Sequence, residues 1–589
     1  MHKWMLKNMK VDYKTMAQEL GVNQILCKVM VNRGIQEIET ARSFLKPDIK
    51  KLHKPLLLKD LEQAVEITKE KILNHKKIRI IGDYDVDGVI STYVLYRALS
   101  SFGAIVDYEI PHRIEDGYGI NNNLIDEAHQ AGIDTIITCD NGISALDQIK
   151  YAKSLGMTVI VTDHHDVPFV EDGAGNRTYL RSEADAIVNH KQLECQYPFK
   201  HLCGAAVAYK FLQALQEELE IDSDLLEELL QFVAIATVCD VVDLVEENRI
   251  IVKKGLELIN KTNNLGLKSL FKAAGIEGKA VSVYTLGFVI GPCINASGRL
   301  DCAKKGLELL LSEGEEEATS LAKELHELNE ERKLMTIEGV EQVIESIEST
   351  CVGRDKVYVV YKEGIHESIA GIIAGRIKDK YHVPTIVLTE AEDGVKGSAR
   401  SIDGYNMFEE LLKCKDLLTK FGGHPMAAGL SLLPENVELV RQRLNELTTL
   451  TEEELTPKVY IDAQLPFEMI DLHLAEELQL LEPFGKANSK PLFAEKNVRI
   501  TSASILGANK NVLKLKLVSQ RGKMMEGIYF GNIPDFEKVV IDGFGAEQLS
   551  LLYNGRSNNI KMDFIFTVGI NEFRGSKSVQ IVIQHYRIG

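Results

Sequence analysis

The chain has 589 residues, of which 45% are hydrophobic and 26% charged, so it has the length and composition of a globular protein with roughly three to four domains. Its net charge of −18 argues against indiscriminate binding to nucleic acids, because Lys and Arg contacts to phosphate dominate that kind of affinity. The nine cysteines include no Cys-x-x-Cys pair, and no signal peptide or apolar run of about twenty residues is visible. These features predict a cytoplasmic protein without a membrane segment.

The first part of the chain predicts a helical lead-in followed by an α/β domain. Residues 1–50 are expected to be mostly helical. A buried strand is predicted at 77–81, followed by an Asp-rich turn and an apolar-periodic helix over 89–99. Residues 133–138 and 158–162 repeat the pattern of a β-branched run that ends at an Asp. Because the carboxyl ends of parallel strands meet at one edge of a sheet, we expect the loops after these strands to converge.

Acidic and imidazole side chains follow each of these strands. They are Asp83, Asp85, Asp87, Asp140, Asp163, His164 and His165. A single Asp after a strand is usually a helix cap or a turn residue, but three carboxylates at alternate positions repel one another unless cations or protons hold them together. Carboxylate oxygens with imidazole nitrogens suit divalent ions, which in phosphoryl transfer activate water and stabilise the leaving oxygen. The set therefore predicts a two-metal phosphodiesterase site.

The middle of the chain predicts a long helix and a second α/β domain. Apolar residues recur every three to four positions over 315–347, which is typical of one connecting helix, assigned to 313–350. The second α/β domain is assigned to 351–455. Its expected elements are strands at 357–361 and 385–388, a helix over 368–380 and a glycine-rich turn at 421–424.

The last segment, 456–589, is predicted to be a β-barrel of the oligonucleotide-binding (OB) type. Leu513, Leu515 and Leu517 alternate with Lys514 and Lys516, which indicates a strand with one apolar and one basic face. A hairpin is expected from 564–568 and 579–583. From residue 497 onward, 12 Lys and Arg against 7 Asp and Glu give a net charge of +5, so the two lysines could track a nucleic-acid backbone. Alternatively, they only keep an edge strand soluble.

Several motifs carry a family resemblance. Asp163-His164-His165, with Asp85-Val86-Asp87 upstream, resembles the DHH phosphoesterase superfamily. Further motifs extend the resemblance, nearly end to end, to the RecJ single-stranded-DNA exonucleases. They lie at 33–35, 44–47, 82–88, 202–205, 237–242, 291–300, 397–401 and 421–424. One departure concerns a local turn and not the chemistry: where the family tends to read Phe-Gly-x-Gly-Asn-Pro, residues 484–489 read Phe-Gly-Lys-Ala-Asn-Ser.

The resemblance implies a DHH catalytic domain at 51–312, a DHHA1 substrate-binding domain at 351–455 and an OB-like domain at 456–589. The implied activity is a metal-dependent 5′→3′ exonuclease that degrades single-stranded DNA to mononucleotides in DNA repair and recombination, with two divalent cations, Mn²⁺ or Mg²⁺. The implied metal ligands are Asp83, Asp85, Asp87, Asp140, His164 and Asp240. Asp163, His164 and His165 are the expected catalytic residues, with their roles undivided. The expected substrate contacts are Arg113, Asn295, Arg299, His366, Ser398, Arg400, Gly422, Gly423 and His424.

Other readings share much of this pattern. A related DHH enzyme could cleave short or cyclic oligonucleotides or pyrophosphate with the same metal set, although the additional β-rich domain argues against it. Some relatives of the superfamily are non-catalytic single-strand-binding scaffolds that have lost ligands, whereas every metal position looks intact here. The resemblance also suggests a single-strand-binding protein and a helicase as partners, beside single-stranded DNA, and no membrane.

Overall fold

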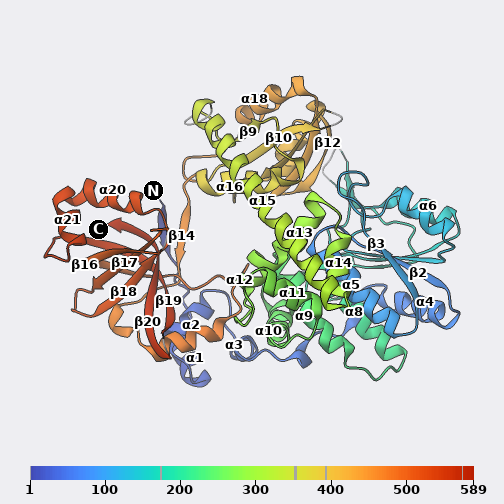
Figure 1. Cartoon of the computed structure of the whole chain (residues 1–589), viewed down its shortest axis with the longest axis horizontal. Helices are drawn as coiled ribbons and strands as arrows, with labels where there is room; N and C mark the ends of the chain where they lie inside the picture. Colours follow the sequence, from blue (N-terminus) through green and yellow to red (C-terminus); the bar gives the residue numbers. More distant parts are fainter. Residues whose placement is uncertain (1, 173–175, 351–353, 392–393, 508, 574) are drawn as a thin grey trace. The chain divides into compact units, whose positions relative to one another are not determined.

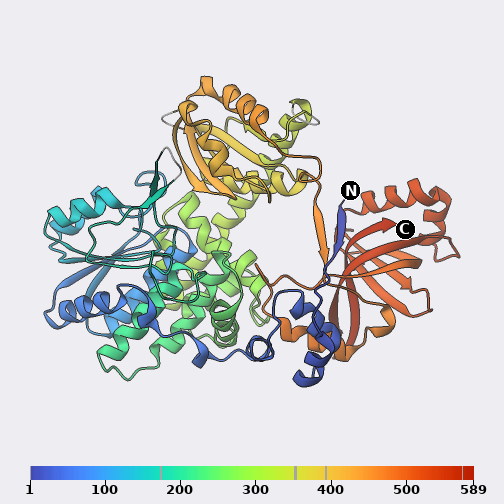
Figure 2. The same ribbon diagram turned by 180° about the vertical axis from the view of Figure 1, so that it is seen from behind.

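The computed structural model of the chain describes residues 2–172, 176–350, 354–391, 394–507, 509–573 and 575–589 (Figure 1; Figure 2 gives the reverse view). The chain forms two compact units. Unit 1 comprises Leu52–Val242 and Lys254–Pro457, and unit 2 comprises His2–Lys51, Asp243–Lys253 and Lys458–Gly589. Within the described ranges, no helix has the length and apolar character of a membrane span.

The first sheet of unit 1 is parallel throughout, as predicted. Its strands, in spatial order, are β3 (Ile105–Glu109), β2 (Lys77–Ile81), β4 (Thr135–Cys139), β5 (Thr158–Thr162) and β8 (Ala186–Val188). Helices cover both faces, which explains why β4 is buried along its whole length. One face is covered by α6 (Asn122–Gln130) and α7 (Leu146–Ser154), and the other by α4 (Leu61–Leu73), α5 (Val86–Ser101) and α8 (Gly204–Glu218). A small hairpin, β6 (Phe169–Glu171) with β7 (Arg177–Tyr179), follows β5.

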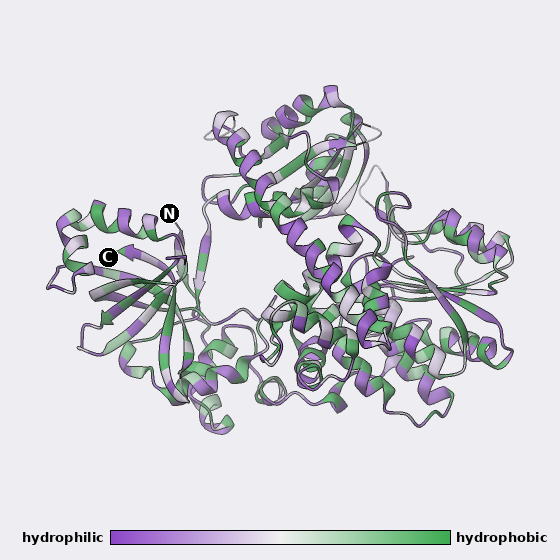
Figure 3. Cartoon of the chain, in the orientation of Figure 1, coloured by the Kyte–Doolittle hydropathy of each residue, from purple (hydrophilic) through white to green (hydrophobic). Residues whose placement is uncertain are grey.

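Helices follow this sheet. They are α9 (Leu225–Cys239), α10 (Glu246–Ile259), α11 (Leu265–Ala273), α12 (Val283–Thr285), the π-turn η3 (Leu286–Ile290), α13 (Gly291–Leu300), α14 (Lys304–Leu311) and α15 (Glu315–Thr350). The predicted connecting helix is α15, which runs for 36 residues. Its buried side chains recur every three to four positions, but the middle of this stripe is polar, at Asn329, Arg332 and Thr336. Helices carry both colours in the hydropathy view, as expected where one face packs and the other meets water (Figure 3).

The second sheet of unit 1 is mixed. Its order is β12 (Leu418–His424), β13 (Ala427–Leu432), β11 (Gly394–Arg400), β10 (Thr385–Ala391) and β9 (Tyr358–Tyr361). Its helices are α16 (Ala370–Tyr381), preceded by the 3₁₀ turn η4 (Glu367–Ile369), α17 (Met407–Leu412) and α18 (Val437–Leu447). The expected start of this domain, residue 351, lies outside the described residues.

The predicted glycine-rich turn at 421–424 is wrong, because these residues form the end of edge strand β12. Gly422 pairs with Gly429, and Gly423 pairs with Ala428. Gly423 fits a close strand pair, because a Cβ on it would lie 2.4 Å from the Ala427 oxygen, whereas a Cβ on Gly422 would meet nothing within 4 Å. The glycines predicted a turn because turns favour this residue, but the missing side chain of Gly423 serves close strand packing.

Unit 2 contains the predicted barrel. Its strands, in order, are β15 (Ala463–Gln464), β16 (Phe493–Leu506), β17 (Val512–Val518), β18 (Met524–Tyr529), β20 (Ser576–Ile588) and β19 (Lys561–Phe573), and β16 also pairs with β19. This last pairing closes the barrel. The predicted hairpin is β19 with β20, whose strands are longer than expected. Between β18 and β19 lie two helices that the sequence analysis did not predict, α20 (Ile533–Phe544) and α21 (Ala546–Tyr553).

The N-terminal residues share the core of this barrel. Helices α1 (Tyr13–Leu20), α2 (Gln24–Val31) and α3 (Ile38–Leu45) bury Leu26, Met30 and Phe44 in one cluster with barrel residues and with α19 (Leu472–Leu478). Strand β1 (Lys3–Leu6) pairs in parallel with β14 (Lys458–Ile461). The fully buried Arg249 donates to the carbonyl oxygens of Phe44, Leu480 and Leu481. Unit 2 is therefore assembled from three separate stretches of the sequence.

Residues 484–489, whose sequence departs from the family pattern, still form a turn. Gly485 and Asn488 form a bridge, and the side chain of the buried Asn488 donates to the oxygens of Leu481 and Pro483. Ala487 adopts a left-handed conformation with φ of 59°. That conformation is disfavoured for residues with a Cβ, which explains the glycine that the family tends to have there.

Candidate metal centre and substrate cleft

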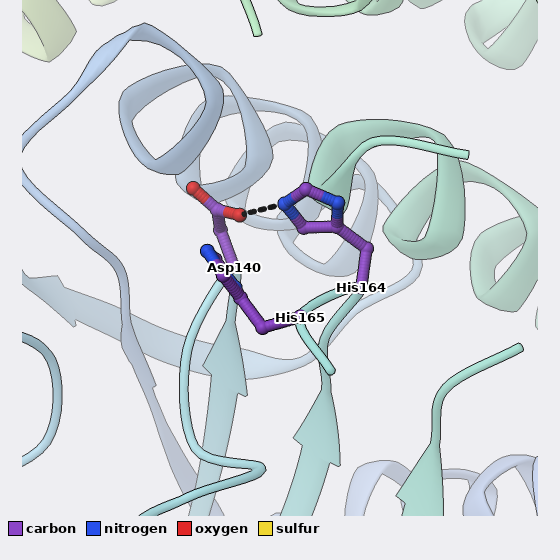
Figure 4. Close-up of side chains that lie close together, drawn as sticks. All are labelled: Asp140, His164 and His165. Carbon is purple, nitrogen blue, oxygen red and sulfur yellow. Dashed lines mark ion pairs between the residues drawn. The ribbon is translucent and has the colours of Figure 1, made fainter. Parts of the chain in front are cut away.

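Three neighbouring parallel strands deliver the predicted acidic residues to one edge of the sheet. Asp83 follows β2, Asp140 follows β4 and Asp163 follows β5. A fourth carboxylate, Asp240, comes from the residue after α9. Atoms of three groups lie within 4.8 Å of one another and could hold a metal ion: Asp83 with Asp85 and Asp140, Asp87 with His164 and Asp240, and Asp140 with His164 and His165 (Figure 4).

The Asp-rich loop is shaped by backbone donors at two helix N-termini. Asp85 caps α5 and accepts hydrogen bonds from the backbone N–H groups of Asp87 and Gly88, at 2.9 and 3.1 Å. Asp87 accepts from the backbone of Gly204 and Ala205 at the start of α8, at 2.6 and 2.8 Å. These backbone donors fix the orientation of both carboxylates, and helix N-termini favour negative charge at such positions. Gly204 is required here because a Cβ would lie 2.7 Å from Asp140.

Several carboxylate oxygens in this cluster have lone pairs without a donor. Asp83 Oδ1, Asp140 Oδ1 and Asp240 Oδ2 are buried and accept no hydrogen bond from the described residues, although His164 Nε2 lies 3.0 Å from Asp140 Oδ1. Burial, reinforced by the neighbouring carboxylates, raises the pKa of Asp83, Asp140 and Asp240 well above the ordinary value. Buried oxygens that repel one another and lack donors match the ligand requirements of divalent cations, so the residues present fit a metal centre.

Asp163 differs from these carboxylates because both of its oxygens are engaged. Oδ2 accepts from the Ile143 backbone at 2.9 Å, and Oδ1 accepts from the backbone of His164 and His165 and lies 2.8 Å from His165 Nδ1. Burial favours the neutral acid, but the charge and hydrogen bonds of His165 hold its pKa below the usual range. The geometry therefore fits Asp163 as the residue that orients the two histidines.

The two histidines are set apart by their surroundings. Burial, with the neighbouring His165, lowers the pKa of His164 to about 3, so its ring is neutral and can act as a ligand. Burial lowers the pKa of His165, but the charge and hydrogen bond of Asp163 raise it by more, so that the pKa of His165 is about 9. His164 Nδ1 lies 3.8 Å from Asp240 Oδ2, and its Nε2 lies 3.7 Å from Asp87 Oδ2. His164 thus faces carboxylates on both sides.

A cleft within unit 1 passes this cluster. One part, of about 680 Å³, is lined by residues of both α/β domains, including Tyr84, Arg113, Ser368 and Ser398, and a second part, of about 960 Å³, includes Asp163 and His165. Tyr118, Lys420, Gly422 and Gly423 line both parts. Each α/β domain therefore contributes one wall of the cleft.

Arg113 lines the first part of the cleft, and Arg299 and Arg400 lie beside residues close to it. The Arg113 guanidinium stacks on Tyr84, 4.5 Å from the ring centroid. Arg299 donates to the Ser368 oxygen at 2.5 Å, and a Cβ on Gly371 would lie 2.7 Å from Arg400 Nη2, so this glycine makes room for the guanidinium. Burial and the repulsion of Arg113 lower the pKa of Arg299 to about 10 and also lower that of Arg400. Such a cationic wall attracts an anion.

The other predicted substrate contacts lie in different settings. Asn295 Oδ1 accepts from the Val86 backbone at 3.1 Å, so it supports the Asp-rich loop. His366 caps the η4 turn, with Nδ1 2.7 Å from Ser368 Oγ. The largely exposed His424 places Nδ1 3.4 Å from Asp166 Oδ2. In unit 2, Lys514 and Lys516 lie on the outside of the barrel, and Lys514 pairs with Glu526 at 2.9 Å.

Sequence reasoning missed two residues, Tyr118 beside the cluster and Lys420 in the lining of the cleft. The Tyr118 hydroxyl donates to the Asp140 backbone oxygen at 2.8 Å and lies 3.3 Å from His165 Nδ1. Its flanking glycines, Gly117 and Gly119, both have positive φ and were a usable signal of a specialised loop. Lys420 carried no signal, because an isolated lysine in a strand is most often a solvent-exposed residue.

Comparisons with known proteins cover most of the chain. Residues 77–237 match the DHH family N-terminal domain, residues 354–449 the DHHA1 domain, and residues 461–585 the RecJ OB domain. The single-stranded-DNA-specific exonuclease RecJ of Escherichia coli is 34% identical over an alignment of 583 positions, which covers 95% of each chain. The enzyme of the same name from Bacillus subtilis is 38% identical over 88% of this chain, which spans 66% of that relative's length.

A solved structure agrees with these matches. RecJ from Thermus thermophilus, in complex with Mn²⁺, aligns with a TM-score of 0.80 and 25% identity over 100% of this chain and 80% of its own. The same protein has also been solved with Mg²⁺.

Proposed function

Because the chain belongs to the RecJ family of single-stranded-DNA-specific exonucleases, we propose that it hydrolyses single-stranded DNA, releasing mononucleotides from the 5′ end. The observation that carries this proposal is the set of buried carboxylate oxygens without donors, on Asp83, Asp140 and Asp240, beside a cleft with a cationic wall. The relatives' activity and their Mn²⁺ and Mg²⁺ complexes support the same chemistry here.

The proposed metal ligands are Asp83, Asp85, Asp87, Asp140, His164 and Asp240. Bound divalent cations would supply an acidified water and neutralise charge on the phosphoryl oxygens. The chain's own part is to hold the ligands in place. Asp163 fixes both histidines through its hydrogen bonds, and Asn295 fixes the start of α5 through the Val86 backbone. The raised pKa of His165, about 9, makes it a proton donor at neutral pH, close to Tyr118 and Asp140.

The proposed polarity depends on the arginine wall. Arg113 and Ser398, which line the cleft, and Arg400, which lies beside Gly371, would offer donors to a terminal phosphate. Stacking on Tyr84 holds Arg113 in place. A phosphate at a 5′ end carries an additional negative charge compared with a phosphodiester, so a cationic pocket favours that end. Gly422, Gly423 and His424 would line the path of the strand, and Lys514 and Lys516 on the barrel would contact its backbone.

The alternative activities share the metal set and differ in substrate. A phosphodiesterase on short or cyclic oligonucleotides would not use the barrel, whereas this chain carries a closed barrel in which strand β17 has a basic outer face. A non-catalytic scaffold is disfavoured because all six ligand positions retain carboxylate or imidazole groups. As partners we propose a single-strand-binding protein and a helicase, as the family resemblance suggests. A cytoplasmic location is likewise proposed from the eight cysteines in the described ranges, all of which are free.

Polarity and strand preference can be tested together. Purified protein with Mn²⁺ is given 30-nucleotide strands labelled at the 3′ end, carrying either a 5′-phosphate or a 5′-hydroxyl, and a matched blunt duplex. We expect faster shortening of the phosphorylated single strand, and a loss of that preference in Arg400→Lys, which keeps the charge but not the planar fork. Equal rates on duplex and single strands, or loss of the 3′ label first, would contradict the proposal.

A further inference from the structure

Asp166 connects the two α/β domains across the second part of the cleft. It lies two residues after His164, and both Asp166 and His424 line that part. Its Oδ2 lies 3.4 Å from Nδ1 of His424, at the end of β12, and its Oδ1 lies 2.9 Å from Nζ of Lys191, on the loop after β8. The carboxylate therefore engages a lysine of its own domain and a histidine of the facing domain.

The contact with Lys191 is anchored, whereas the contact with His424 is exposed. Asn189 accepts from the Lys191 backbone at 2.7 Å and donates to the His165 oxygen at 2.9 Å, so the lysine belongs to a loop fixed beside the metal centre. The side chain of Lys191 is 32% exposed, against 65% for Asp166 and 55% for His424. Exposed charged contacts contribute little free energy because water and salt screen them. Asp166 can therefore release His424 and keep Lys191 as its partner.

The contact between Asp166 and His424 lies in the proposed path of the strand. His424 lines the same part of the cleft as Asp163 and His165 of the metal centre. A carboxylate and a phosphodiester each carry one negative charge on oxygen acceptors, so Asp166 offers His424 the kind of acceptor that a strand phosphate would offer. A phosphate that enters beside His424 must displace this carboxylate, because the two like charges repel each other.

A second charged contact spans the same part of the cleft. Arg177 Nη2, on β7, lies 3.7 Å from Glu409 Oε1, on α17. The arginine is held in place by Glu171, at 2.8 Å, and by stacking on Phe169, 4.3 Å from the ring centroid. Arg177, Phe169 and Glu409 all line this part. The two walls therefore do not depend on Asp166 alone, and loss of its carboxylate should leave them in place.

We propose that Asp166 is a positioning residue that competes with a phosphate of the strand for His424, and so lowers the affinity of the chain for single strands. This inference rests on the proposed function, because the competing phosphate belongs to that substrate. When a strand binds, its phosphate replaces the carboxylate beside His424 Nδ1, and Asp166 stays paired with Lys191. Weaker binding of the substrate does not slow the chemical step, because only interactions that are stronger in the transition state accelerate it.

Binding without turnover gives the first test. The full-length protein in EDTA is titrated with a 3′-fluorescein 20-nucleotide strand, and anisotropy reports Kd. Asp166→Asn should lower Kd about two- to fivefold, the range of one exposed ion pair, whereas Asp166→Glu keeps the carboxylate and should bind like the wild type. The matched control is Asp416→Asn, which removes the same charge. Asp416 is 62% exposed, pairs with Arg443 and lines neither part of the cleft, so this variant should also bind like the wild type.

Coupling to His424 gives the second test. In a His424→Ala background, Asp166→Asn should change Kd by less than about twofold, because the group for which carboxylate and phosphate compete is gone. An equal decrease in Kd in both backgrounds would show a general effect of charge and would overturn the proposal. A higher Kd in Asp166→Asn than in the wild type would show that the carboxylate supports the site, and would overturn it as well.

Turnover gives the third test and separates Asp166 from the metal centre. With Mn²⁺, Asp166→Asn should lower KM on the 20-nucleotide strand and leave kcat unchanged, because the competition affects only the binding of the strand. A lower kcat, or a changed affinity for Mn²⁺, would make Asp166 part of the metal centre and contradict competition at His424.

The outcomes distinguish this inference from the proposed function. A wild-type chain that neither binds nor shortens single strands overturns the proposed function itself. A wild-type chain that does both, with Asp166→Asn indistinguishable from Asp416→Asn in Kd, overturns the competition at His424 and leaves the proposed function standing.

Discussion

Opposite effects on stability are expected from removing two neighbouring carboxylates, Asp163 and Asp140. In Asp163→Asn, the amide nitrogen cannot accept a hydrogen bond, so either the Ile143 N–H or the donors on the histidine side lose their partner. One unpaired buried donor, together with the lost charge opposite His165, should lower the free energy of unfolding by about 2–4 kcal/mol in metal-free protein. The pKa of His165 should also fall below about 9.

Asp140→Asn should instead stabilise the metal-free protein. Burial and the nearby carboxylates raise the pKa of Asp140 above its value in the unfolded chain. Between the unfolded-state and the folded-state pKa, the folded protein keeps a proton that the unfolded chain releases, so Asp140 lowers the free energy of unfolding increasingly as the pH rises through this range. Asparagine has no carboxyl group to ionise, so the substitution removes this destabilising contribution. With saturating Mn²⁺ the order reverses, because the wild type gains stability from the bound ions and Asp140→Asn loses a ligand.

Urea unfolding at pH 7.5, in EDTA and in Mn²⁺, measures both effects. Circular dichroism is the suitable probe, because the chain's one tryptophan, Trp4, belongs to unit 2 and does not report the unit that contains the cluster. Asp379→Asn is the matched control. Its side chain is 73% exposed, pairs with the neighbouring Lys378, and should shift stability by less than about 0.5 kcal/mol. If the Asp163 and Asp140 variants shifted stability in the same direction, or lost Mn²⁺ affinity equally, the division between orienting residue and ligand would be refuted.

Three further predictions follow from local geometry. Ala487→Gly should raise the free energy of unfolding of unit 2 by about 0.5–1 kcal/mol, because it relieves a left-handed alanine, while the control Ala546→Gly at a helix start should lower it by about 0.5 kcal/mol. Unfolding followed by Trp4 fluorescence measures both changes, and a change of the same sign in both variants, or of reversed signs, would contradict this prediction. Burial raises the pKa of Asp87 to about 6, so the increase in melting temperature caused by Mn²⁺ should grow from about pH 5 to pH 7, and a pH-independent increase would count against carboxylate ligation. Lys516→Ala should lower the slope of log Kd against log salt concentration for strand binding by about 0.7, and Lys514→Ala should lower it by less, since Lys514 is already paired with Glu526. An unchanged slope in both variants would contradict a role of the barrel in binding DNA.

The strands and the acidic positions were predictable from the sequence because their signals are local. Strands β2 and β5 have the predicted bounds, and a parallel sheet must bring the loops after them together. The division of roles within the cluster was not predictable. Asp163 and Asp140 occupy equivalent places after strands, and only the backbone of Ile143 and the histidines distinguishes them.

The burial of Arg332 was equally unpredictable, because the sequence places it among ordinary charged residues of a long helix. Its burial depends on how α13 and α16 pack against α15. The assembly of unit 2 from distant stretches of the chain could not be predicted for the same reason. The apolar faces of α1, α2 and α3 show that these helices pack against other elements, but they do not show which ones.

The most direct test of the central claim is the product formed from a single strand by the wild type and by Asp83→Asn. Asp83 supplies one of the buried oxygens without a donor and holds no helix cap, so its amide variant should fold while lacking a proposed ligand. With Mn²⁺, the wild type should convert a 5′-phosphorylated 30-nucleotide strand to mononucleotides, EDTA should abolish the reaction, and Asp83→Asn should lower kcat by at least about a hundredfold, with an unchanged circular dichroism spectrum. Undiminished turnover in Asp83→Asn, or in the wild type with EDTA, would contradict a metal-dependent nuclease at this cluster.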